Sequence, residues 1–110
     1  MFRFLFCSSI DDNVEKFRRT PIAMLLDVRR SEEYAAVRIP GSVNLPLEKI
    51  KEIDRLSVDR YEPLFIYSAD GTRSGQAAAA LRAMGYVNAE NIGALRDYTG
   101  PLEGGRGRAR

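Results

Sequence analysis

Two short, largely apolar runs constrain the fold of this chain more than any other feature. AMLLDV occupies residues 23–28 and LFIY occupies 64–67, and a segment with helical character follows each. Such runs are typical of strands that are buried on both faces of a parallel sheet. Because parallel neighbours need crossover connections, the alternation of strands and helices predicts an α/β fold. We expect an open parallel sheet with helices on both faces.

The rest of the chain alternates between further strand and helix patterns. Apolar residues at helical spacing predict a helix over 10–18 with Ser9 as its cap, and another helix with Ser31 as its cap. Ser74 is expected to open a long alanine-rich helix that ends before Gly85. The other expected features are strands at 2–7, 42–44 and 89–92, a helical segment at 46–53, a turn or short helix at 93–98, and a core contact from Leu102.

Length and charge predict one small domain. A chain of 110 residues suits a single core, so we expect one domain over residues 1–103 and a disordered Gly/Arg tail at 104–110. Lys and Arg number 17 against 15 Asp and Glu, but three of the arginines lie in the last seven residues. The body, with 14 basic and 15 acidic residues, therefore has no basic footprint for nucleic acid.

Hydropathy predicts no membrane partner. No apolar run approaches the ~20 residues that cross a bilayer. The apolar start has no small-residue cleavage site after it, so we interpret it as a strand rather than a signal peptide, and a cytoplasmic location is the expectation. Phe2, Phe4 and Phe6 on an edge strand would support a weak homodimer, and a monomer is the alternative.

The counts of cysteine and histidine exclude several kinds of site. The chain has one cysteine, Cys7, and no histidine, so an intramolecular disulfide and a Cys/His zinc site are impossible. A Ser-His-Asp or Cys-His nucleophile pair is excluded because its base is missing. No metal and no cofactor are expected, and Cys7 is interpreted as a core residue.

The segment that carries the predicted chemistry follows the second apolar run. Ligands of open parallel sheets bind outside the carboxyl ends of the strands, and residues 68–73 lie at such an end, before a helix. Their backbone N–H groups and the helix N-terminus favour an anion such as a persulfide, sulfate, thiosulfate or phosphate. The Asp70 carboxylate opposes an anion if it turns inward. The predicted anion-binding loop consists of Ser68, Ala69, Asp70, Gly71, Thr72 and Arg73.

The chain resembles the rhodanese family of sulfurtransferases. The matching segments, in the family's order, are LLDVRRSEEY at 25–34, RIPGSVNLPL at 38–47, FIYSADGTRSGQAAAALRAMGY at 65–86 and NIGAL at 91–95.

The resemblance implies an active loop that begins with cysteine and ends with arginine, with four residues between them. Ser68 stands in the place of the cysteine, and Arg73 in that of the arginine. Asp27 and Arg29 match the family's strand end beside the loop, and Arg38 stands where many members have histidine.

Serine at this place changes the expected function. The family's thiolate holds the transferred sulfur as a persulfide, whereas a hydroxyl does not ionise near neutral pH and no histidine can deprotonate it. We therefore predict no appreciable thiosulfate sulfurtransferase activity, and a module that binds a small sulfur-containing anion or a protein thiol or persulfide donor. The alternative is a genuine sulfurtransferase whose cysteine was replaced by an engineered Ser68.

Two further functions are compatible with the sequence, and several residues have two possible roles. A phosphatase-like loop needs one more residue between cysteine and arginine, and a pure protein-interaction domain would bind no anion. Asp27 and Arg29 are expected either to bind substrate or to form a structural ion pair. Arg38 is expected at the pocket mouth or in solvent, and Ser74 as a helix cap rather than a catalytic group.

Overall fold

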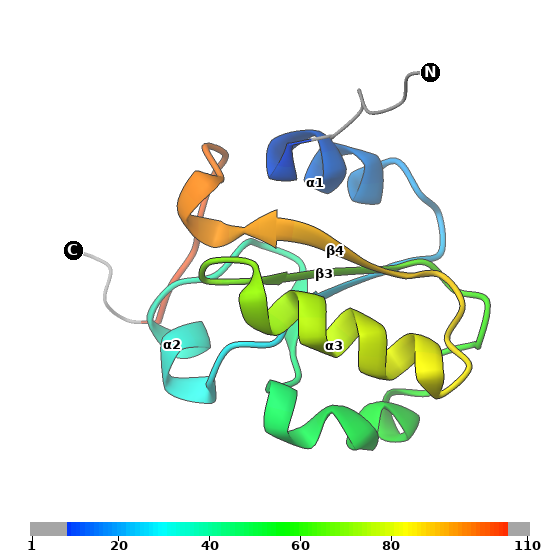
Figure 1. Ribbon diagram of the computed structural model, residues 1–110. Coiled ribbons are helices and arrows are strands. Elements are labelled where there is room, and N and C mark those ends of the chain that lie inside the picture. Colours follow the sequence, from blue (N-terminus) through cyan, green and yellow to red (C-terminus); the bar gives the residue numbers. More distant parts are fainter. Residues whose placement is uncertain (1–8, 106–110) are drawn as a thin grey trace.

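A computed structural model describes residues 9–105, in which four strands form one sheet (Figure 1). The order β2-β1-β3-β4 places the two apolar runs, β1 and β3, at its centre. Each neighbouring pair is parallel, which confirms the predicted open parallel sheet. The strands are β1 (Met24–Asp27), β2 (Ser42–Asn44), β3 (Leu64–Ser68) and β4 (Ala89–Ala94).

Helical elements cover both faces of the sheet, as predicted. They are α1 (Ile10–Arg18), α2 (Ser31–Ala36), the 3-10 helix η2 (Leu47–Leu56), α3 (Thr72–Ala83) and the 3-10 turn η3 (Leu95–Asp97). Successive residues of β1 and β3 point to opposite faces. Leu25 and Phe65 are buried with α1, whereas Leu26 and Ile66 are buried beneath α3 and η2 (Figure 1).

Several element bounds agree with the sequence-based expectations. The helix at 10–18 and the strand at 42–44 have the predicted bounds, and the Asp12 N–H donates to Ser9 Oγ at 3.1 Å. The helical segment expected at 46–53 begins at Leu47, after Pro46, and is a 3-10 helix. Local spacing and capping therefore determine much of this architecture.

The two helix caps expected at Ser31 and Ser74 are wrong. α2 begins at Ser31 and has Arg30 as its N-cap residue, whose N–H donates to Glu33 Oε1 at 2.9 Å. α3 begins at Thr72, so Ser74 is the third residue of the helix and is fully buried. A serine before an apolar helix pattern thus indicated each helix correctly, but not its cap residue, which is Arg30 for α2 and Gly71 for α3.

Of the expectations for the two ends of the chain, the core contact from Leu102 is wrong. Leu102 is 48% exposed and does not close the core. The Gly105 N–H donates to the Ala35 carbonyl at 2.6 Å, so the chain still contacts α2 at that residue. Cys7 and the strand expected at 2–7 lie outside the described residues. No helix of the described part is long and apolar enough to span a membrane.

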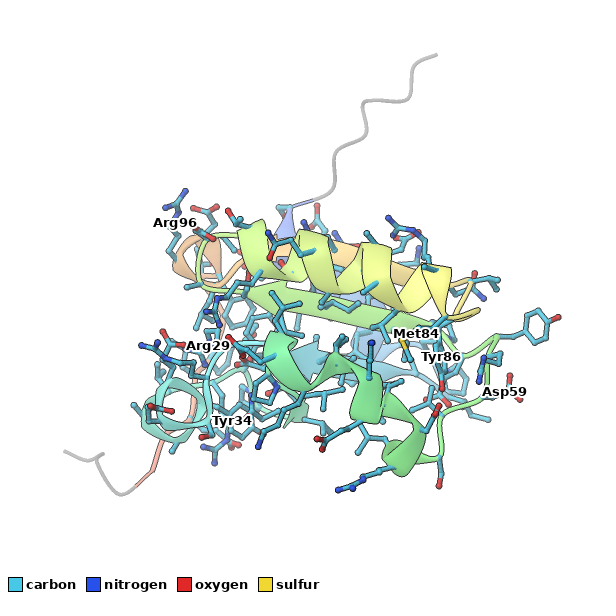
Figure 2. All side chains as sticks on the ribbon, turned by 60° about the horizontal axis from the view of Figure 1, so that its bottom comes forward. Arg29, Tyr34, Asp59, Met84, Tyr86 and Arg96 are labelled. Carbon is cyan, nitrogen blue, oxygen red and sulfur yellow. The ribbon has the colours of Figure 1, made fainter. Side chains whose placement is uncertain are left out.

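The parallel strands all end at the same edge of the sheet, where the candidate site lies. Asp27 ends β1 and Ser68 ends β3, and both side chains are fully buried. Figure 2 shows Arg29 and Arg96 at this end of the molecule, and Tyr86 at the opposite end. The fold thus gathers residues that are far apart in sequence at one edge.

Candidate functional site

The loop between β3 and α3 is a tight turn around the side chain of Ser68. Gly71 precedes the first residue of α3 with φ 89°, a left-handed conformation that favours glycine. Ser68 Oγ accepts the N–H of Gly71 at 3.1 Å and the N–H of Ser74 at 3.0 Å. Its third contact is the Ser74 hydroxyl, 2.9 Å away. Two backbone N–H groups, one of them from Ser74 beyond the predicted loop, therefore converge on the oxygen of Ser68.

Asn91 of β4 joins this loop to the sheet, and the sequence analysis missed it as a site residue. Its Nδ2 donates to the Gly71 carbonyl at 3.1 Å, and its Oδ1 lies 2.7 Å from Ser74 Oγ. The signal available in the sequence was a polar side chain at the start of NIGAL, two residues before a glycine. Asn91 thus contributes to the loop from the neighbouring strand.

Asp70 folds back on the loop instead of facing Ser68. Its Oδ1 accepts the N–H of Thr72 at 2.9 Å. The hydrogen bonds from the Thr72 backbone and hydroxyl, together with the positive charge of Arg96, hold the pKa of Asp70 below its usual range. The carboxylate is therefore ionised at neutral pH and is held by the loop that carries it.

Asp27 and Arg29 form a buried ion pair at the end of β1. Arg29 Nη2 donates to Asp27 Oδ2 at 2.7 Å and also to the Val37 carbonyl, and Nε donates to Asp27 Oδ1 at 3.0 Å. Burial acts to lower the pKa of Arg29, but the bonds and charge of Asp27 outweigh it and raise that pKa. The geometry is that of a structural ion pair, one of the two roles considered for these residues.

A pocket of about 500 Å³ lies beside the loop. Four arginines and two carboxylates line it together with Ala69 and Thr72. Arg29 and Arg73 already have acidic partners, since Arg73 Nη2 lies 3.2 Å from Glu48 Oε2. Arg30 and Arg96 form no ion pair among residues 9–105. The charged lining residues are Arg29, Arg30, Arg73, Arg96, Glu33 and Asp70.

Arg73 has bonding capacity left after its contact with Glu48. Its Nη1 is buried and has no hydrogen-bond acceptor within the described part of the chain. Buried donors of this kind normally have a protein or water partner. Ser68 does not line the pocket itself and lies beneath its wall, with Gly71 and Ser74 on its oxygen.

Arg38 does not line this pocket. Its Nε lies 3.0 Å from Glu103 Oε2, and its guanidinium stacks over the Tyr34 ring at 4.9 Å. The structure therefore brings together the loop, Arg29 and Ser74, and leaves Arg38 outside. Within residues 9–105, no group of three acidic, Cys or His side chains is placed to hold a metal ion.

Comparison with known proteins places these observations in a family. The model of the rhodanese-like domain family matches residues 9–96. Thiosulfate sulfurtransferase PspE of Escherichia coli is 38% identical over 77 residues, 69% of this chain and 74% of that protein. Human thiosulfate:glutathione sulfurtransferase is 33% identical over 92 residues, 69% of this chain and 78% of that protein.

Solved structures agree with the sequence relatives. A structure described as a rhodanese with anions from E. coli superimposes with a TM-score of 0.69 at 36% identity, over 76% of this chain and 99% of that chain. The family match extends from the first residue before α1 to η3, and so includes every strand and the whole loop.

Proposed function

The chain belongs to the rhodanese-like domain family, and on this basis we propose that its pocket binds a small sulfur-containing anion without transferring sulfur. The observation that carries the proposal is the Ser68 hydroxyl, which is buried and held by three hydrogen bonds beside an arginine-rich pocket. The relatives indicate the class of ligand, since two are named for thiosulfate and one structure for its anions.

The arginines supply the attraction for an anion. The pocket lining carries four guanidinium groups against two carboxylates, and Arg30 and Arg96 have no ion-pair partner in residues 9–105. A guanidinium offers a planar pair of donors that suits an oxyanion such as thiosulfate. Arg73 Nη1, at the end of the loop, has no acceptor within residues 9–105. These groups favour a compact divalent anion over a neutral ligand.

The chemistry of Ser68 accounts for the proposed lack of turnover. Sulfur transfer needs a thiolate that attacks the sulfane sulfur of a donor, releases the rest of the donor and keeps the sulfur as a persulfide until an acceptor thiol takes it. A serine hydroxyl does not ionise near neutral pH, and the chain has no histidine to accept its proton. The proposed role is therefore binding of a sulfur-containing anion, or of a protein thiol or persulfide donor.

Calorimetric titration with sodium thiosulfate tests the binding. Arg96→Gln and Arg30→Gln each remove a guanidinium that has no ion-pair partner in residues 9–105. We expect each to weaken thiosulfate binding about tenfold, the equivalent of one charged hydrogen bond. Arg19→Gln is the matched control, because Arg19 is an exposed residue after α1 whose ion pair with Glu15 spans 3.7 Å. Equal weakening by the control, or no binding of thiosulfate at millimolar concentration, would refute the proposal.

A second candidate function is that of a genuine sulfurtransferase whose reactive cysteine was replaced by an engineered Ser68. The family match and the retained loop geometry favour it. Ser68→Cys is then expected to transfer sulfur from thiosulfate to cyanide, with thiocyanate as the measured product, while the chain with Ser68 forms none. A folded Ser68→Cys variant without activity would eliminate this candidate and leave the binding module.

A further inference from the structure

Three polar side chains form a continuous chain of hydrogen bonds from the loop to β4. Ser68 Oγ lies 2.9 Å from Ser74 Oγ, which lies 2.7 Å from Asn91 Oδ1. Both serines are fully buried. Hydroxyl groups both donate and accept, so the distances alone do not say in which direction the protons point. The two ends of the chain decide that direction.

The orientation of the Asn91 amide is fixed by two backbone groups with only one possible role each. The N–H of Gly93 can only donate, and it donates to Asn91 Oδ1 at 3.0 Å. The carbonyl of Gly71 can only accept, and it accepts from Asn91 Nδ2 at 3.1 Å. Exchanging the oxygen and nitrogen of the amide would break both bonds. Asn91 therefore presents an oxygen to Ser74.

This orientation sets every proton in the chain. The Asn91 oxygen is only an acceptor, so the Ser74 hydroxyl proton points to it at 2.7 Å. Ser74 Oγ can then only accept from Ser68, and the Ser68 hydroxyl donates to it at 2.9 Å. The two lone pairs of Ser68 take the N–H groups of Gly71 and Ser74. A hydroxyl at position 68 is thus satisfied as one donor and two acceptors.

An irregularity in the sheet places Asn91 where it can act. The register of β4 against β3 shifts between Ile66 and Tyr67, which pair with Asn91 and Gly93, so that Ile92 is the extra residue. Gly93 has φ 121°, in the region that favours glycine. Bulges of this kind redirect side chains and are common beside functional sites. Here the bulge accompanies a local bond from Gly93 to the Asn91 side chain.

We propose that Asn91 is a positioning residue that makes position 68 suited to a proton donor and unsuited to a thiolate. It acts through Ser74, whose hydroxyl proton it holds away from position 68. A thiolate there would receive the N–H groups of Gly71 and Ser74 but would find the Ser74 hydroxyl oriented against it. This inference rests on the proposed function in one respect, the assignment of position 68 as the reactive position of the family.

Titration of a thiol at position 68 tests the inference. In the Ser68→Cys variant the thiol pKa is measured by thiolate absorbance against pH. Adding Asn91→Ala releases the Ser74 proton, and the charged sulfur is a stronger acceptor for it than the Gly71 carbonyl, which lies 3.2 Å from Ser74 Oγ. We expect the thiol pKa to fall and the thiolate fraction below that pKa to rise about tenfold.

Two controls separate this effect from a loosened loop. Asn88→Ala removes an amide at the other end of β4, where Asn88 donates to the Tyr61 carbonyl at 2.7 Å, and is expected to leave the thiol pKa unchanged. In the presence of Ser74→Ala, the change Asn91→Ala should lose its effect, because no hydroxyl proton remains to be released. An unchanged or raised pKa on Asn91→Ala, or a fall that persists without Ser74, would overturn the proposal.

A measurement on the unsubstituted chain tests the inference even if the variants do not fold. The positions of the two hydroxyl protons can be measured by neutron diffraction, and we expect the Ser74 proton to lie between Ser74 and Asn91 and the Ser68 proton between Ser68 and Ser74. A Ser74 proton that points to Ser68 instead of Asn91 would overturn the proposal directly. Neither readout needs a bound anion, so a chain that shows the expected proton order but no affinity for thiosulfate would refute the proposed function alone.

Discussion

The carboxyl ends of β1 and β3 lie side by side in the sheet, and each buries a polar side chain next to the same pocket. At β1 the carboxylate of Asp27 forms an ion pair with the guanidinium of Arg29, which lies two residues later in the chain. At β3 the neutral hydroxyl of Ser68 is held by amides and by another hydroxyl. One strand end therefore buries two opposite charges, and the other buries none.

This difference distinguishes a strand end that tolerates little substitution from one where substitution can change the chemistry of the site. Removing one member of a buried ion pair leaves a charge without a partner, so the end of β1 tolerates little change. A neutral hydrogen-bond network loses less stabilising free energy when one member is replaced, and a replacement side chain can donate where the original accepted. We infer that the end of β1 determines the shape of the pocket, and the end of β3 determines its chemistry.

The largest expected effect is on the ion pair at β1. Arg29→Met leaves the buried Asp27 carboxylate with the backbone N–H of residue 29 but without its charged partner, and we expect the free energy of unfolding to fall by about 3–5 kcal/mol, measured by urea denaturation. Arg19→Met, at an exposed pair with Glu15, is the control and should change it by less than about 1 kcal/mol. A loss of similar size in both variants would contradict the contrast between the two strand ends.

A smaller loss is expected at β3. Ser68→Ala leaves the buried N–H of Ser74 and the N–H of Gly71 without their acceptor, and we expect the free energy of unfolding, again from urea denaturation, to fall by about 1–3 kcal/mol. Ser31→Ala serves as the control, since Ser31 is exposed in the first turn of α2. A larger loss of unfolding free energy for Ser68→Ala than for Arg29→Met would contradict the proposed difference in tolerance between the two strand ends.

The smallest effect concerns Asp70 and acid. Its pKa in the folded chain is lowered, so its carboxylate stabilises the fold above the ordinary aspartate pKa of about 3.9, and this contribution is lost as pH falls through the lower folded value. Asp70→Ala should therefore flatten the decline of Tm below about pH 4. A steeper decline for Asp70→Ala would be the contrary result.

The arrangement of strands and helices could be predicted because it depends on local patterns. The apolar runs of β1 and β3 and the helical spacing of α1 are readable along the chain, and the loop follows from its position after β3. The resemblance to a family added Asp27 and Arg29. Arg29 lines the pocket, and Asp27 is paired with it.

Some parts of the site depend on contacts between distant segments and could not be predicted. Asn91 reaches the loop because β4 has a bulge against β3, and no local pattern indicates that register shift. Arg38 was expected at the pocket mouth or in solvent, and its contact with Glu103, 65 residues away, had no signal in the sequence. Arg96 reaches the pocket from η3, and only the crossover geometry places it there.

The alanine-rich underside of α3 has a consequence for how this site can change. Ala77 and Ala78 are 0% and 1% exposed and belong to the core between α3 and the sheet. A leucine at either position would lift the helix, as overpacked cores do, and would tilt its first turn with it. Since the N–H of Ser74 is in that turn, a substitution on the helix underside, remote from any bound anion, would shift the donors at position 68.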